Sequence, residues 1–179
     1  YLIIKSPWPA MTRGLLHDDK RYLETYWSRF ANIWFHGDYV YVDKDNLWYM
    51  RGRTDDVINV SGHRMSTAEI EQTVISHKKI SDAASISIPD DLTGEAIVVF
   101  IVADDKFEKI PSSEISDYIS KKIGKLAKPK LIIQLSDLPK TRTGKIMRRL
   151  LRSKLLGTDL GDLSSIENPF ILDEIQKLG

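Results

Sequence analysis

The sequence contains no cysteine, which excludes disulfide bonds, zinc–thiolate sites and a cysteine nucleophile. Its longest apolar run, residues 96–103, is far shorter than the roughly 20 residues needed to cross a membrane. No signal-peptide pattern is present. The four histidines lack the spacing of metal ligands, such as a pair four residues apart on one helix, so we expect no metal site in this chain. These absences favour a cytoplasmic protein.

The sequence also lacks a glycine-rich dinucleotide fingerprint, an internal repeat and any low-complexity stretch. A hydrophobic content of 42% is sufficient for a core, and 28% charged residues is typical of a soluble protein. With 179 residues the chain has room for one ordinary domain, or for a small domain and part of another. Because it begins with Tyr1 rather than Met, we expect a fragment or a processed chain.

Positive charge is concentrated in residues 119–154. This segment contains twelve Lys or Arg and one acid, Asp137, a charge of +11, whereas the remainder has fourteen bases and twenty-four acids, a charge of −10. Such a stretch indicates a surface that faces anions, and nucleotides, coenzyme A and nucleic acids all qualify on charge alone. The segment has no Phe, Tyr or Trp on which bases could stack, which disfavours a nucleic-acid-binding module.

The apolar pattern and the turn-forming residues predict helices alternating with strands, and hence a small α+β domain. The expected helices span residues 19–30, 67–77, 112–124 and 146–156, with a short one from residue 171. The expected strands span residues 1–5, 34–41, 47–50, 57–60, 83–88, 95–102 and 131–135.

Several residues predict where the helices begin and end. Asp18 or Asp19 is expected to cap the first helix. Ser66 and Glu69 have the spacing of a capping box at the start of the second. Gly124 is a candidate left-handed terminator of the third.

The segment PKTRTGK at residues 139–145 places one lysine, Lys145, after a glycine-containing turn. A strand-like run precedes the segment and a basic helical run follows it. Lys145 therefore lies on a loop between two ordered elements, where binding and catalytic residues are often found. An ammonium on such a tether can reach a phosphate or a carboxylate and withdraw again. A solvated basic turn is the alternative interpretation.

A second segment, GRTDDVINVSGHR at residues 52–64, is followed by TAEIE at residues 67–71 and preceded by Gly37-Asp38. In order and spacing these motifs resemble the C-terminal region of the adenylate-forming enzymes, which include acyl-CoA synthetases, firefly luciferase and the adenylation domains of peptide synthetases. The resemblance covers essentially the whole chain. Trp8-Pro9, residues 19–30 and His63-Arg64 look most like the AMP-forming acetyl-CoA synthetases.

The resemblance implies two parts. Residues 1–54 would be the C-terminal end of a large AMP-binding domain, because they are too few to bury a complete core. Residues 55–179 would be the compact C-terminal lid. Asp55 is implied to be the hinge about which the lid rotates, since aspartate tolerates unusual backbone conformations. A helix cap or a turn is the alternative role for Asp55.

The implied activity is that of an acetate–CoA ligase (AMP-forming), which joins acetate to AMP and then transfers the acetyl group to coenzyme A. The substrates would be acetate, ATP and coenzyme A, with Mg²⁺ held by phosphates and by the rest of the enzyme. Because the acyl pocket has no counterpart here, propionate or another short acid is the alternative substrate. The phosphate loop and the adenine pocket are also missing, so we expect this chain to be inactive alone.

The resemblance also implies roles for single residues. Lys145 would bridge acetate and ATP and neutralise charge in the transition state. The other implied contacts are ribose for Asp38 and Arg53, a nucleotide phosphate for Arg64, and the pantetheine tunnel for Ser61 and Gly62. The simpler alternatives are a turn aspartate for Asp38, a surface ion pair for Arg53 and a tight turn for Gly62.

One position departs from the family pattern. Where acetyl-CoA synthetases often have an arginine for the 3′-phosphate of coenzyme A, this chain has Ser120. Lys121 and Lys122 follow directly and could act as point charges in its place. We therefore predict Lys121 and Lys122 as coenzyme A contacts.

Overall fold

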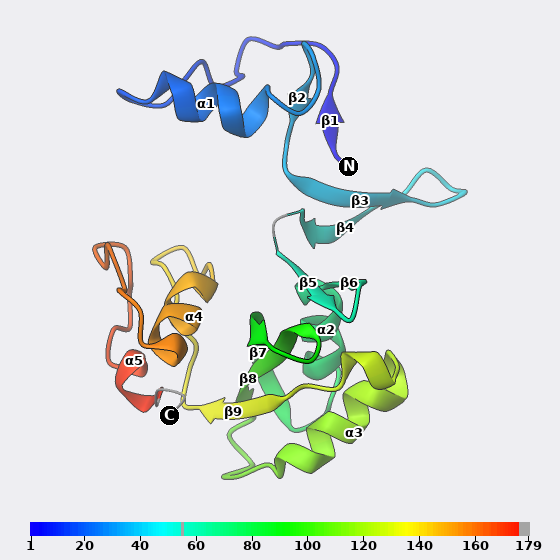
Figure 1. Ribbon diagram of the computed structural model, residues 1–179, viewed down its shortest axis with the longest axis vertical. Helices are drawn as coiled ribbons and strands as arrows, with labels where there is room; N and C mark the ends of the chain where they lie inside the picture. The colour runs from blue at the N-terminus through cyan, green and yellow to red at the C-terminus, as the bar shows by residue number, and fades with distance from the viewer. Residues whose placement is uncertain (55, 176–179) are drawn as a thin grey trace. The chain divides into compact units, whose positions relative to one another are not determined.

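The computed structural model describes residues 1–54 and 56–175, apart from the side chain of residue 51. The chain divides into two compact units, Tyr1–Asp56 and Val57–Gly179, whose elements are labelled in Figure 1. The second unit combines helices with a largely antiparallel sheet, as the predicted α+β class requires. In the described residues, no helix has the length and apolar character needed to span a membrane.

The first unit has one helix and two small antiparallel sheets. Its elements are β1 (Ile3–Ile4) paired with β2 (Trp34–Phe35), helix α1 (Asp19–Tyr26), and β3 (Asp38–Val42) paired with β4 (Trp48–Arg53). Asp18 is the cap of α1, because its carboxylate accepts a hydrogen bond from the N–H of Arg21 at 3.1 Å. A turn at residues 43–46 joins β3 to β4.

Aromatic side chains form the core of this unit. The ring of Tyr26 stacks on Trp34 with 4.2 Å between centroids. Helix α1 ends at Tyr26, four residues earlier than predicted. Trp27 and Phe30 lie beyond it and pack against Trp34 and Phe35, with centroid separations of 5.7 and 6.1 Å. The helix predicted over residues 19–30 was therefore too long, and Trp27 and Phe30 pack from the segment that follows it.

The second unit is built on a five-stranded sheet in which β8 is central. Its strands are β5 (Val57–Val60), β6 (His63–Ser66), β7 (Ile80–Asp90), β8 (Gly94–Ala103) and β9 (Leu131–Leu135), in the order β6-β5-β8-β7 with β9 also paired to β8. Only β9 runs parallel to its neighbour β8. Its helices are α2 (Thr67–Ile75), α3 (Ser112–Lys122), the 3₁₀ turn η1 (Lys125–Ala127), α4 (Arg148–Leu156) and α5 (Ile171–Glu174).

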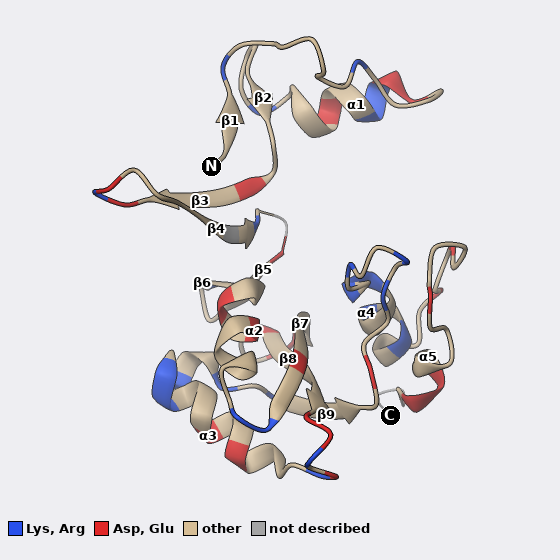
Figure 2. Ribbon diagram, turned by 180° about the vertical axis from the view of Figure 1, so that it is seen from behind, with Lys and Arg blue, Asp and Glu red and all other residues tan. Residues whose placement is uncertain are grey.

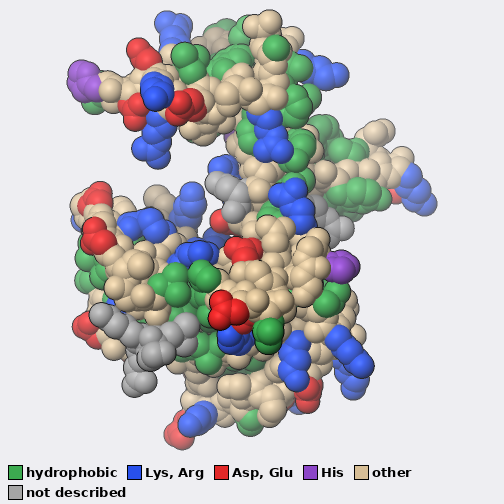
Figure 3. Space-filling view, in the orientation of Figure 1, with side chains coloured by type: hydrophobic (Ala, Val, Ile, Leu, Met, Phe, Trp, Pro, Cys, Tyr) green, Lys and Arg blue, Asp and Glu red, His purple; other side chains and the backbone are tan. Residues whose placement is uncertain are grey.

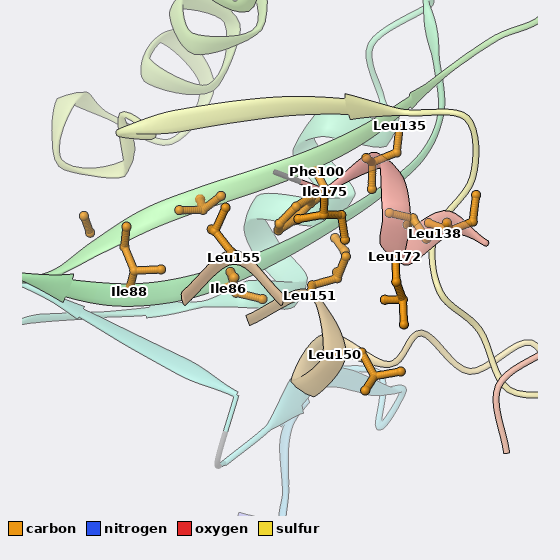
Figure 4. Packing of buried hydrophobic residues seen from close by; sticks show 14 residues of the cluster. Ile86, Ile88, Phe100, Leu135, Leu138, Leu150, Leu151, Leu155, Leu172 and Ile175 are labelled. Atoms are coloured by element: carbon orange, nitrogen blue, oxygen red, sulfur yellow. The ribbon is translucent and has the colours of Figure 1, made fainter. Parts of the chain in front are cut away.

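Two cores lie on opposite faces of this sheet, because successive side chains of a strand point to opposite faces. On β8, Ala96, Val98 and Phe100 belong to the core that includes residues of α4 and α5 (Figure 4). Ile97 and Val99, with Ile101, belong to the core that includes residues of α2 and α3. A continuous apolar run on β8 is thus explained by burial on both faces.

Several predicted boundaries were wrong in detail. Strands β7 and β8 are longer than expected, since they pair with each other along nearly their whole length. Ser66 precedes α2, but its side chain makes no capping hydrogen bond, so this half of the predicted capping box is missing. Gly124 follows α3 with φ +133° and ψ +166°, which is an extended glycine conformation rather than the predicted left-handed one. The left-handed terminator is Gly157, at the end of α4.

Candidate functional site

Lys145 follows a tight hydrogen-bonded turn. The N–H of Gly144 donates to the carbonyl of Thr141 at 2.8 Å, and the N–H of Thr141 donates to the carbonyl of Lys145 at 2.9 Å. Gly144 has φ +79°, a conformation that glycine adopts without steric cost. A turn closed by a left-handed glycine is one of the common three-residue hairpin loops. The glycine of the motif therefore sets the turn that presents Lys145.

The hairpin extends on both sides of this turn. Lys140 and Ile146 pair as an antiparallel bridge, and the N–H of Met147 donates to the carbonyl of Pro139 at 2.8 Å. Because residues 146 and 147 belong to the hairpin, helix α4 begins at Arg148 and not at Ile146, where it was predicted. We call residues 139–147 the lysine hairpin.

The two lysines of this hairpin differ in environment. Lys145 is exposed, and among the described residues its ammonium has no hydrogen bond or ion pair. Lys140 Nζ lies 2.9 Å from both Asp82 Oδ2 and Asp137 Oδ1. Burial alone would lower the pKa of Lys140, but the hydrogen bonds to these two carboxylates outweigh it and raise the pKa. The charge of Lys140 is therefore used inside the protein, whereas that of Lys145 is available to a ligand.

Asp38 and Arg53 are brought together in the first unit, where they face each other across β3 and β4. Asp38 Oδ1 lies 3.7 Å from Arg53 Nη1, and its Oδ2 lies 3.3 Å from His36 Nε2. Gly37 has φ +90°, and a Cβ there would stand 3.0 Å from the Arg53 guanidinium, so glycine permits this approach. His36 was not singled out as a neighbour of Asp38 from the sequence. Contact with a ribose stays a prediction.

Ser61 and Gly62 form the two-residue turn between β5 and β6. Their φ angles are +49° and +82°, as a type I′ hairpin turn requires. A Cβ on Gly62 would meet nothing within 4 Å, so inside this chain the glycine is explained by backbone conformation. Its predicted role in a pantetheine tunnel is untested by these contacts.

Arg64 is the register partner of Asn59 across β5 and β6, and it is exposed. Over the described parts of the chain, its guanidinium has no hydrogen bond or ion pair, so its charge is available to an anion. Its contact with a nucleotide phosphate stays a prediction. The predicted hinge, Asp55, lies outside the described residues.

Lys121 and Lys122 belong to the last turn of α3, and both are exposed. One end of α3 is coloured blue, for basic residues, in Figure 2. Lys122 Nζ lies 5.8 Å from the ring centroid of Tyr118. Both cations also suit the negative end of the helix dipole, which is a sufficient structural reason for them. The Oγ of Ser120 is buried and has no hydrogen-bond partner in the described part of the chain. Ser120 therefore does not present its hydroxyl to a ligand at the surface.

The basic segment 119–154 is not one anion-facing surface, which corrects the sequence-based interpretation. Six of its bases contact carboxylates, carbonyls or hydroxyls of the protein: Lys130, Lys140, Arg148, Arg149, Arg152 and Lys154. On the face shown in Figure 3, basic and acidic side chains of the second unit are interspersed. The charge counted along the sequence of this segment therefore overestimated how many of its basic side chains are available to bind an anion.

A bidentate ion pair at the start of α4 was missed by sequence reasoning. Arg148 donates from Nε to Glu71 Oε1 at 2.9 Å and from Nη2 to Glu71 Oε2 at 2.6 Å. Glu71 on α2 is buried, and its Oε1 also accepts from the N–H of Ser85 at 2.7 Å. This pair fixes the first residue of α4, directly after the lysine hairpin. The two residues are 77 apart in sequence, so no local pattern indicated it.

Among the described residues, no group of three or more His, Cys, Asp or Glu side chains is arranged to hold a metal ion.

Residues 69–145 match the family described as "AMP-binding enzyme C-terminal domain". The chain is 41% identical over 181 residues to an acetyl-coenzyme A synthetase of Pyrobaculum arsenaticum and 43% identical over 183 residues to acetyl-coenzyme A synthetase 1 of Candida albicans. These alignments include 99% and 97% of the chain. Residues 69–145 are an AMP-binding enzyme C-terminal domain. The chain spans 27% of the length of each of these two relatives.

Solved structures share the fold of this chain. An ATP-bound RpMatB–BxBclM chimera superposes with a TM-score of 0.70 over 79% of this chain and 28% of the other, at 21% identity. The amide bond synthetase McbA of Marinactinospora thermotolerans superposes with a TM-score of 0.69 over 78% of this chain and 28% of the other, also at 21% identity. The mixed helix and sheet fold expected from the sequence is thereby confirmed.

Proposed function

We propose that this chain is the C-terminal part of an acetate–CoA ligase (AMP-forming), in which Lys145 assists adenylation. The observation that carries the proposal is an exposed lysine on a braced hairpin, in a chain 41–43% identical to proteins named acetyl-coenzyme A synthetase. The charge of Lys145 has no use within the described structure. A free cation on a hairpin with a fixed backbone is suited to act on a bound anion.

In the first half-reaction an acetate oxygen attacks the α-phosphorus of ATP, the bond to the β-phosphate oxygen breaks, and pyrophosphate leaves. Negative charge accumulates on the oxygens around the α-phosphorus. The ammonium of Lys145 stabilises that charge electrostatically and transfers no proton. The hairpin supports this role, because its hydrogen bonds fix the backbone while the side chain stays free to reach the reactants.

In the second half-reaction the thiol of coenzyme A attacks the acetyl carbon, loses its proton, and AMP leaves. We propose that the lid turns about Asp55 between the two steps, so that Lys145 withdraws and the turn at Ser61 and Gly62 faces pantetheine. Lys121 and Lys122 are the proposed contacts to the charged end of coenzyme A. In Figures 1 and 2 the lysine hairpin beside α4 and the β5–β6 turn lie at different places in the second unit. This separation is consistent with one turn serving each half-reaction.

The first unit is proposed to be the end of a larger AMP-binding domain. Its β3–β4 hairpin leaves large apolar side chains about half exposed or more, among them Tyr41 at 52%, Trp48 at 63% and Met50 at 54%. Such a surface favours a further partner layer of protein. Asp38 and Arg53 are the proposed ribose contacts, and Arg64 is the proposed phosphate contact.

Mg²⁺ is proposed to act with ATP, held by phosphate oxygens and by residues outside this chain. The acyl substrate is proposed to be acetate on the names of the relatives, with propionate or another short acid as the alternative. A nucleic-acid-binding role is not favoured, because half of the basic segment is engaged within the protein.

The test is a product assay on the full-length protein with acetate, ATP, Mg²⁺ and coenzyme A. We expect acetyl-CoA, AMP and pyrophosphate in equal amounts, with acetate preferred over propionate. The present chain, assayed alone, is expected to form no acetyl-CoA, because we find no surface in its described residues that would fix both reactants beside Lys145. Release of ADP and phosphate, or turnover by the chain alone, would contradict the proposal.

A further inference from the structure

We propose that Asn168, which follows the family match at residues 69–145, is a positioning residue for Lys145. The inference depends on the proposed role of Lys145 in adenylation. Asn168 lies in the C-terminal segment 163–175, which runs alongside the lysine hairpin and forms its third strand-like edge. The geometry points to this segment as a brace that holds the hairpin in the orientation needed for the first half-reaction.

The side chain of Asn168 is buried and makes three hydrogen bonds to the base of the hairpin. Its Oδ1 accepts from the N–H of Lys140 at 3.0 Å. Its Nδ2 donates to Asp137 Oδ2 at 2.9 Å and to the carbonyl of Leu138 at 2.8 Å. Asn168 is 8% exposed, so water cannot readily replace these bonds.

The backbone of the segment completes the brace on the same edge. The N–H of Glu167 donates to the carbonyl of Lys140 at 2.8 Å, and Ile166 pairs with Thr141 as an antiparallel bridge. Both backbone groups of Lys140 are therefore bound by the C-terminal segment. The opposite edge of the same strand carries the returning arm of the hairpin, through Thr141 and Pro139.

Thr141 transmits this placement to Lys145. The N–H of Thr141 donates to the carbonyl of Lys145 at 2.9 Å, and its Oγ1 accepts from the N–H of Lys145 at 3.1 Å. The backbone of Lys145 is thus held at both its polar groups by one residue. Thr141 follows Lys140 in sequence, and the backbone N–H of Lys140 is bound by Asn168. A shift of Asn168 would therefore be passed through Lys140 and Thr141 to Lys145.

The brace is itself anchored in the core. Ile171, Leu172 and Ile175 of the segment are buried in the cluster that also contains Leu138, just ahead of the hairpin (Figure 4). Glu174 accepts a hydrogen bond from the N–H of Ser136 at 2.9 Å. The C-terminal segment is therefore built into the support of the proposed catalytic lysine.

The test is Asn168→Ala in the full-length enzyme, with the two half-reactions assayed separately. Because a displacement of about 1 Å can cost on the order of 100-fold in rate, we expect acetate-dependent ATP–pyrophosphate exchange to fall 10- to 100-fold. The KM for ATP should change little. Thioester formation from supplied acetyl-adenylate and coenzyme A should stay within about twofold, since Lys145 has withdrawn in that step.

Two further variants keep the result interpretable. Ile119→Val removes a methyl group from the core that includes residues of α2 and α3, and it controls for general destabilisation. This variant should lower both half-reactions equally or leave both unchanged. Lys145→Ala separates this inference from the function on which it rests. Suppose that Lys145→Ala abolishes exchange. The positioning role is then wrong if Asn168→Ala leaves exchange intact, and also if Asn168→Ala lowers both half-reactions equally. If Lys145→Ala spares exchange, the proposed function itself fails.

Discussion

At the scale of the residue, each basic side chain of segment 119–154 is either engaged within the protein or available to a ligand. Arg148 and Lys140 are engaged, by Glu71 and by Asp82 with Asp137. Lys145 has no such partner among the described residues. The same residue type therefore serves the fold at one position and is free for chemistry five residues later.

Arg148→Met should destabilise the fold, because it leaves the buried carboxylate of Glu71 without its bidentate partner. Breaking a buried ion pair from one side costs about 3–5 kcal/mol. We expect a loss of about 3 kcal/mol in the free energy of unfolding, since Ser85 still donates to Glu71. The measurement is urea denaturation, with Lys125→Met as the control at an exposed lysine that has no ion pair in the described structure.

The Glu71→Leu, Arg148→Met double variant should recover much of that loss, because it removes both charges together. An Arg148→Met variant as stable as the Lys125→Met control would show that the pair contributes nothing. A double variant no better than the single one would show that the packing of Arg148, rather than its charge, matters.

At the scale of the element, two short hairpins present the proposed functional residues. The β5–β6 turn uses Ser61 and Gly62 with positive φ, and the lysine hairpin uses Gly144 with φ +79°. Glycine provides in both cases a backbone conformation that other residues adopt at a cost. The functional side chains therefore project from turns whose shape the local sequence specifies.

Gly62→Leu should slow the second half-reaction while leaving adenylation nearly intact, because a bulky side chain would block the proposed pantetheine tunnel. Gly62→Ala is the matched control. It has the same positive-φ cost, about 1–2 kcal/mol, and its Cβ meets nothing within 4 Å in this chain. Separate assays of the two half-reactions provide the measurement. Equal effects of Leu and Ala would reduce Gly62 to a residue of the turn alone.

The elements that could be predicted from sequence are those with strong local patterns. The strands β8 and β9, the alternation of helices with strands, and the turn before Lys145 follow from apolar runs and glycine placement. The N-terminus of α4 could not be predicted, because its first two expected residues pair with Lys140 and Pro139 instead. The Glu71–Arg148 and Asn168–Lys140 contacts join distant segments, and no local periodicity encodes them.

At the scale of the whole molecule, the chain consists of two compact units and spans 27% of the Pyrobaculum arsenaticum relative. The first unit brings Asp38 and Arg53 together, and the second carries Lys145 on its braced hairpin. The proposed chemistry needs both, together with the surfaces that hold ATP and acetate. The central proposal is that the lid brings the charge of Lys145 to the reactants for adenylation and then withdraws it.

The most direct measurement of that claim is Lys145→Ala in the full-length enzyme, with each half-reaction followed separately. We expect acetate-dependent ATP–pyrophosphate exchange to fall by at least 100-fold, because one preorganised electrostatic contact contributes about 10²–10³ in rate. Thioester formation from supplied acetyl-adenylate should stay near the wild-type rate. Lys140→Ala is unsuitable as a control, because Lys140 supports the hairpin. Equal loss of both half-reactions, or exchange at the wild-type rate, would contradict the assignment of Lys145 to adenylation.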